Sequence, residues 1–132
     1  MVQTGRFGPD EARASFETSL SELGVESVDV LLLHECRPAD LRTEGLLEFL
    51  ESLVQAGRIR YFGTATDEDS TRTILNESPG FGHITQLRHN ALEPALTRLP
   101  GLAGRATITH SSMRVLMARL TEAMRDEGRR QR

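Results

Sequence analysis

The chain has 132 residues, of which 38% are hydrophobic and 27% are charged, and its formal net charge is −3. This composition is typical of one folded globular domain and argues against a disordered or membrane-spanning chain. The small negative charge gives no reason to expect binding to nucleic acid or to a membrane surface. Cys36 is the only cysteine, so no internal disulfide is possible, and no apolar leader follows Met1. Both features predict a cytoplasmic protein.

The basic residues of the chain are unusual in kind. All 16 residues of the combined lysine and arginine count are arginines, because the sequence contains no lysine. A reaction that needs a lysine, either as a Schiff base or as a cation beside a proton donor, therefore cannot be completed by this chain alone. Tyr61 is the only tyrosine.

The first half of the chain predicts two helices and two strands in alternation. A helix begins at Pro9, where acidic residues follow in its first turn, and ends at Gly24. The nearly continuous apolar run of residues 28–34 predicts a strand that is buried on both faces, as in a parallel sheet. A leucine-rich helix over residues 46–54 and a second strand over residues 59–65 follow.

The second half continues the alternation with weaker signals. We expect a short helix over residues 70–75, strands over residues 84–89 and 105–110, and a last helix over residues 115–125. Alternating strands and helices of this length indicate right-handed crossovers and a parallel α/β fold. About four such units make half of a (β/α)8 TIM-type barrel, so residues 1–132 are predicted to form one incomplete domain. An open four-stranded doubly wound sheet is the alternative, and the pattern alone does not choose between them.

Polar side chains follow the predicted strands at the points where they end. His34 ends the first strand, and Thr66 and Asp67 follow the second. The last two strands end in polar residues at positions 86, 88–90 and 110–112. Because ligands of parallel α/β folds bind at the carboxyl ends of the strands, these residues are the candidate site. Asp67 and the nearby Asp69 are interpreted as caps of the following helix and not as acid–base groups.

Several of these segments resemble the aldo-keto reductase family. The stretch Ser-Leu-Ser-Glu-Leu-Gly (19–24) followed by Val-Asp-Val-Leu-Leu-Leu-His (28–34) resembles the family's helix that leads into a strand ending in histidine. The resemblance continues through residues 46–63 and extends more faintly to residues 86–90 and 108–113. It covers the middle part of the family's barrel.

The resemblance implies a (β/α)8 barrel that reduces carbonyl compounds with NADPH, using aspartate, tyrosine, lysine and histidine together. A phenol with a pKa near 10 is a poor proton donor at neutral pH unless a neighbouring cation lowers that value. Only His34 falls on one of these catalytic positions. The counterparts of the aspartate, tyrosine and lysine are expected upstream of Met1, and Tyr61 does not match the catalytic tyrosine.

The resemblance also implies cofactor-binding residues. Gln86 matches a family glutamine that contacts the nicotinamide carboxamide, and Ser111 matches a serine near the pyrophosphate. His110 replaces the usual stacking tyrosine, and an imidazole can still stack on the nicotinamide. Ala65 and Thr66 stand where the family usually has serine and asparagine, so one threonine hydroxyl replaces an amide.

Two other kinds of site are not expected. The spacing of His83 and His89 is not that of a metal-ligand pair, and Cys36 has no partner pattern, so no metal site is predicted. A nucleophilic pair of His110 and Ser111 is not expected either, because neighbouring side chains of a strand point to opposite faces.

The resemblance therefore implies an NADPH-dependent oxidoreductase that acts on a small carbonyl compound. Because three catalytic residues are missing, we expect the isolated chain to be inactive. One alternative is a non-catalytic half-barrel that covers its open edges by forming a homodimer or by pairing with a complementing chain. Another is a truncated gene product with no independent role.

Overall fold

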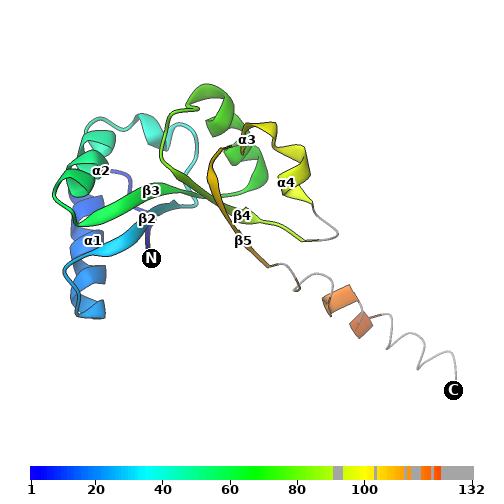
Figure 1. Ribbon diagram of the computed structural model, residues 1–132, viewed down its shortest axis with the longest axis horizontal. Helices are drawn as coiled ribbons and strands as arrows, with labels where there is room; N and C mark the ends of the chain where they lie inside the picture. The colour runs from blue at the N-terminus through cyan, green and yellow to red at the C-terminus, as the bar shows by residue number, and fades with distance from the viewer. Residues whose placement is uncertain (91–93, 103, 112, 114–116, 120, 123–132) are drawn as a thin grey trace, which may run out of the picture.

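The strands form one parallel sheet in the computed structural model, which describes residues 1–90, 94–102, 104–111, 113, 117–119, 121 and 122. The strands lie in the order in which they occur in the chain (Figure 1): β1 (Val2–Thr4), β2 (Val28–His34), β3 (Ile59–Ala65), β4 (Ile84–Arg88) and β5 (Ala106–His110). A doubly wound sheet reverses its strand order at a switch point, whereas a barrel keeps adding strands in one direction. The observed order is therefore that of a partial barrel.

The helices connect successive strands and pack on one face of the sheet (Figure 1). They are α1 (Pro9–Leu23), α2 (Leu46–Gln55), α3 (Glu68–Glu77) and α4 (Ala95–Arg98), with short 3-10 turns at Asp40–Arg42 and Pro100–Leu102. The predicted limits of α1 are confirmed. Pro9 occupies its first turn, and Gly24 ends it in the left-handed conformation with φ 65°.

The main core lies between the sheet and the first two helices. Leu31 and Leu33 of β2 point to this side, because alternate residues of a strand share a face. They pack with Phe16 of α1 and with Leu46 and Leu50 of α2, and each of these five side chains is at most 1% exposed. A smaller cluster of Leu75, Leu87, Ala95 and Leu99 joins α3 and α4 to β4.

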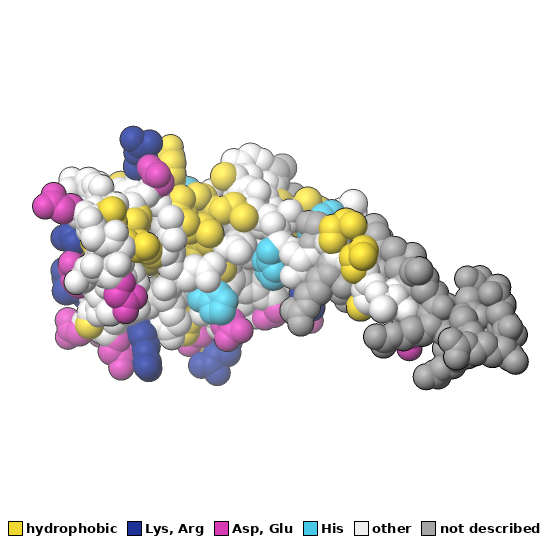
Figure 2. All heavy atoms as spheres, turned by 90° about the horizontal axis from the view of Figure 1, so that it is seen from below, with side chains coloured by type: hydrophobic (Ala, Val, Ile, Leu, Met, Phe, Trp, Pro, Cys, Tyr) yellow, Lys and Arg dark blue, Asp and Glu magenta, His cyan; other side chains and the backbone are white. Residues whose placement is uncertain are grey.

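The opposite face of the sheet carries no helix in the described part of the chain. Its apolar residues come only from strands: Leu32, Ala65 and Ile84 are buried, and Val30 and Ile108 pack partly buried beside them. In a complete barrel this face would line the interior. Figure 2 shows hydrophobic side chains gathered over the middle of the molecule with histidines nearby.

The structure adds to the predicted elements at two places. It has five strands and not four, because β1 is only three residues long and too short to give a periodic pattern. The helix predicted over residues 70–75 extends over Glu68–Glu77, because Asp67 caps it earlier than the apolar pattern indicates. The predicted last helix lies largely outside the described residues.

Among the described residues, no helix is both long enough and apolar enough to cross a bilayer.

Candidate active site

A cavity of about 650 Å³ lies at the carboxyl ends of the strands. This volume is within the range of small-molecule sites. Four residues predicted from the sequence line it together: His34, Thr66, Gln86 and His110. The other lining residues are Glu35, Ala65, Asp67, Glu68, Arg88 and Arg98. The structure thus brings together side chains from the ends of four successive strands.

The register of the sheet explains why these side chains meet. His34 of β2 is paired with Ala65 of β3, and Ala65 is paired with Gln86 of β4. Arg88, two residues after Gln86, is paired with His110 of β5. Because alternate residues share a face, Gln86 and Arg88 lie on the inner face one above the other. Arg88 and His110 therefore form a layer closer to the cavity mouth.

Gln86 is held by a second glutamine from the far edge of the sheet. The Nε2 of Gln3 on β1 donates a hydrogen bond to Oε1 of Gln86 at 3.0 Å. This contact uses one acceptor position of Gln86 and leaves its own Nε2 hydrogens as donors. The sequence pattern gave no signal for Gln3, because β1 itself was not predicted.

Thr66 and Asp67 are engaged with the start of α3. The Asp67 carboxylate accepts hydrogen bonds from the backbone N–H and the hydroxyl of Ser70, both at 2.8 Å. The bond from the Ser70 backbone is the main reason why the pKa of Asp67 lies below its ordinary value. The predicted capping role is therefore confirmed for Asp67, whereas Asp69 lies within the first turn of α3 and pairs with Arg72 at 3.1 Å. Thr66 donates from its hydroxyl to Asp67 at 3.3 Å, so that hydroxyl has limited capacity for a ligand.

His110 and Ser111 contact each other, contrary to the argument from strand alternation. Nδ1 of His110 lies 3.0 Å from Oγ of Ser111. The expectation was wrong because Ser111 follows the end of β5 and has a left-handed backbone with φ 62°, so the alternation no longer applies. Ser111 itself is not among the residues that line the cavity, but it orients the ring of one that is.

The two cavity histidines share a local backbone feature. Glu35 directly follows His34 and has φ 54°, as Ser111 follows His110 with φ 62°. These are the two non-glycine residues with positive φ in the described part of the chain. A left-handed conformation costs a non-glycine residue about 1 to 2 kcal/mol. Such strain concentrates at functional sites, where the surrounding structure maintains it.

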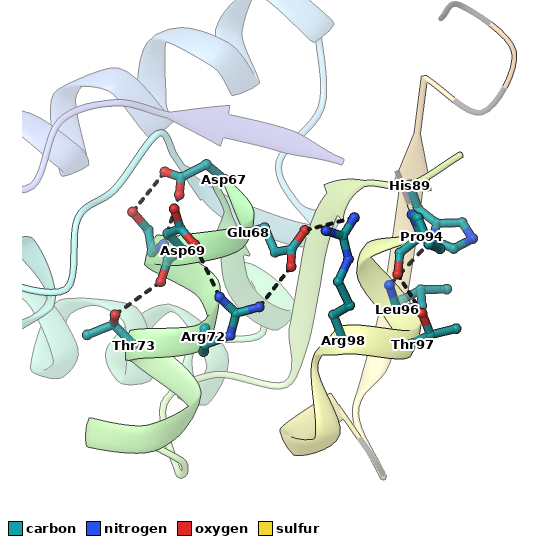
Figure 3. A network of polar contacts seen from close by, with 11 residues as sticks. Asp67, Glu68, Asp69, Arg72, Thr73, His89, Pro94, Leu96, Thr97 and Arg98 are labelled. Atoms are coloured by element: carbon teal, nitrogen blue, oxygen red, sulfur yellow. Dashed lines mark hydrogen bonds and ion pairs between the residues drawn. The ribbon is translucent and has the colours of Figure 1, made fainter. Parts of the chain in front are cut away.

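Charged residues also line the cavity, and Figure 3 shows the ion pairs that two of them, Glu68 and Arg98, form. Glu68 at the start of α3 contacts Arg72 at 2.8 Å and Arg98 of α4 at 3.7 Å. Arg88 is exposed on the inner face at the end of β4. It lies within residues 86–90, which the sequence predicted as part of the site, whereas no pattern placed Arg98 here. The described residues contain no group of three His, Cys, Asp or Glu side chains suited to hold a metal ion.

The strands follow one another in the order of a barrel, and the inner face carries no helix among the described residues. A polar cavity lies at the carboxyl ends of the strands, where the active sites of α/β-barrel enzymes are found. These features define a partial α/β barrel. The sequence model of the aldo/keto reductase family matches residues 3–94. The chain belongs to that family.

Individual relatives agree with this assignment. The uncharacterized oxidoreductase YcsN of Bacillus subtilis (strain 168) is 36% identical over 62 residues, which are 47% of this chain and 20% of YcsN. The thermostable aldo-keto reductase Tm1743, solved in complex with the inhibitor epalrestat, superposes with a TM-score of 0.69 at 22% identity. That match covers 96% of this chain and 52% of Tm1743.

A third relative was solved with a cofactor. The Bombyx mori aldo-keto reductase AKR2E4, in complex with NADP, has a TM-score of 0.59 at 20% identity. The match covers 83% of this chain and 39% of AKR2E4. The chain thus spans about half or less of the length of these relatives. At these identities the solved structures show the shared fold.

Proposed function

We propose that this chain supplies the nicotinamide-binding side of an NADPH-dependent carbonyl reductase site. The observation that carries the proposal is the cavity that gathers His34, Thr66, Gln86 and His110 from successive strand ends. Membership of the aldo/keto reductase family supports an oxidoreductase function, and the NADP complex of AKR2E4 supports a nicotinamide cofactor.

The residues of the cavity fit a nicotinamide group. The Nε2 hydrogens of Gln86 are available to a carboxamide oxygen, because Gln3 occupies only the Oε1 side of that residue. The exposed ring of His110 offers a face for stacking, and its contact with Ser111 limits its rotation. NADPH, when bound, would supply the hydride. His34 would donate a hydrogen bond to the carbonyl oxygen of a small substrate and orient it.

A complete reaction needs a proton donor that this chain lacks. The sequence has no lysine to lower the pKa of a phenol, and its one tyrosine is not in the cavity. Tyr61 lies near the amino ends of the strands, with its ring centroid 5.7 Å from that of His83. We therefore propose that the isolated chain binds the cofactor without reducing a carbonyl compound, and that the donor comes from another segment or chain.

The test is titration of the purified chain with NADPH, followed by cofactor fluorescence and by the melting temperature. We expect saturable binding and a raised melting temperature. Replacing Gln86 with alanine should weaken binding about tenfold, equivalent to roughly 1.4 kcal/mol for one hydrogen bond. The matched control is Gln55→Ala, because Gln55 is exposed at the end of α2 and should leave affinity unchanged. A folded chain that does not bind NADPH would refute the proposal.

The open sheet favours association as a second candidate function. β1 pairs only with β2 and β5 only with β4 among the described residues, so each sheet edge has unpaired backbone groups. Five strands of an eight-stranded barrel leave three to be supplied, whereas two copies would bring ten. We therefore propose a complementing partner with three strand–helix units and a lysine. Light scattering tests this: a stable homodimer would contradict it, and a monomer that binds such a partner would support it.

A further inference from the structure

Arg88 is a cavity residue whose positive charge is not paired with a carboxylate among the described residues. Its side chain makes no hydrogen bond or ion pair with any residue that the structure describes, although it is exposed at the end of β4. It lies on the same face as Gln86 and is in register with His110. A ligand that contacts Gln86 and His110 therefore meets a free guanidinium next to both.

A second arginine of the same cavity is only weakly held. Arg98 of α4 has its one ion pair among the described residues with Glu68, at 3.7 Å. Figure 3 shows Glu68 between Arg98 and Arg72. The contact of Glu68 with Arg72 is shorter, at 2.8 Å, so the carboxylate is shared and Arg98 keeps donors for another oxygen. The guanidinium fork suits the paired oxygens of carboxylate and phosphate.

The acidic residues of the cavity do not cancel these charges. Asp67 accepts a hydrogen bond from the Ser70 backbone at the start of α3, and Glu68 accepts one from Arg72. Glu35 is the remaining carboxylate, and it forms no ion pair with Arg88. The cavity therefore presents two guanidinium groups: Arg88 has no ion pair among the described residues, and Arg98 shares its one carboxylate, that of Glu68, with Arg72.

We propose that this cavity binds a ligand through an anionic oxygen group held between Arg88 and Arg98. Two sources share this chemistry: the phosphates of the nicotinamide nucleotide, and the carboxylate of an oxo acid substrate. The choice of these sources rests on the proposed function. The anion site itself is a property of the two arginines and can be measured without the reaction.

The experiment is calorimetric titration of the chain with inorganic pyrophosphate, pyruvate and NADPH at constant ionic strength. Acetone, which has the carbonyl group of pyruvate without its carboxylate, is the uncharged control ligand. The variants are Arg88→Gln and Arg98→Gln, and the matched control is Arg60→Gln. Arg60 is 77% exposed near the amino end of β3, where it pairs with the exposed Asp29, so its loss removes the same charge far from the cavity. Circular dichroism verifies that each variant is folded.

We expect at least one of the two anions to bind, with an affinity that falls about tenfold in Arg88→Gln, by less in Arg98→Gln and not at all in Arg60→Gln. Pyrophosphate binding alone assigns the site to the nucleotide, and pyruvate binding assigns it to an oxo acid. Equal losses in all three variants, or no anion binding by the folded chain, would overturn the inference. NADPH binding in the absence of any anion binding that depends on Arg88 would refute the anion site and leave the cofactor proposal intact, whereas anion binding without NADPH binding would do the reverse.

Discussion

Gln3 and Gln86 are hydrogen-bonded side chain to side chain at 3.0 Å, although they lie on β1 and β4 with two strands between them. The bond crosses the inner face of the sheet, where Gly63 and Ala65 have little or no side chain to obstruct it. It ties the first strand of the chain to the residue that is central to the proposed cofactor site. The short β1 therefore acts on the cavity and not only on the sheet edge.

Replacing Gln3 with leucine tests this coupling. Loss of one net hydrogen bond is worth about 0.5 to 1.5 kcal/mol, so NADPH affinity should fall by about two- to tenfold as Gln86 becomes free to rotate. Fluorescence titration measures the affinity, and urea unfolding measures any general loss of stability. Gln55→Leu is the control on the outside of the molecule. An unchanged affinity in Gln3→Leu would show that Gln86 is positioned without Gln3.

The left-handed residue after His34 predicts an unusual stabilising change. Glu35→Gly should raise the free energy of unfolding by about 0.5 to 1 kcal/mol, because relief of strain exceeds the added entropy of the unfolded chain. The same substitution at Glu51, in the middle of α2, should lower it by about 1 kcal/mol, because glycine disfavours a helix interior. Urea unfolding of both variants measures the two signs. A lower stability of Glu35→Gly would mean that the Glu35 side chain makes a stabilising contact.

The sequence predicted those parts of the fold whose signals are local. The apolar run of β2, the leucines of α2 and the stop at Gly24 each determine their element within a few residues. The ends of the strands also predicted which polar residues share the cavity, because parallel strands bring their carboxyl ends to one edge. What could not be predicted depends on three-dimensional contacts: the pairing of β1 with β2, and the approach of Arg98 to the cavity.

The cap of α3 predicts a dependence of stability on pH. Asp67→Ala should lower the free energy of unfolding by about 1 kcal/mol, and Asp67→Asn by less, because asparagine can still accept from Ser70. The folded-state pKa of Asp67 is below its ordinary value of 3.8, so its contribution is present above that value and is lost as the pH falls through the folded-state pKa. The difference between wild type and Asp67→Ala should therefore shrink in acid. Urea unfolding at pH 7 and pH 3 measures it, and a constant difference would contradict the assignment.

Gly63 marks the closest approach of β3 to β4. A Cβ atom built on it would lie 1.9 Å from the carbonyl oxygen of Ile84, so alanine cannot fit without separating the strands. We expect Gly63→Ala to cost about 3 kcal/mol or more, at the upper end of the range for overpacking. Gly80→Ala is the control, because nothing lies within 4 Å of the corresponding position. Melting temperatures of the two variants compare them, and similar values would show that the strands are not so tightly apposed.

Cys36 should be unreactive in the folded chain and should make stability fall in alkali. The side chain is fully buried, and burial is the main reason why the pKa of the thiol is raised to about 12 from 9.0. Between these two values the unfolded chain releases the proton that the folded chain keeps, so stability falls with rising pH by up to about 1.4 kcal/mol per pH unit. The Cys36→Ala variant lacks this loss, although it starts from a lower stability because a buried atom is removed. Urea unfolding from pH 8 to pH 10.5 measures both slopes, and a thiol reagent at pH 8 should modify Cys36 only after urea is added. Rapid modification without urea would place the thiol at the surface and remove the basis for the alkaline slope.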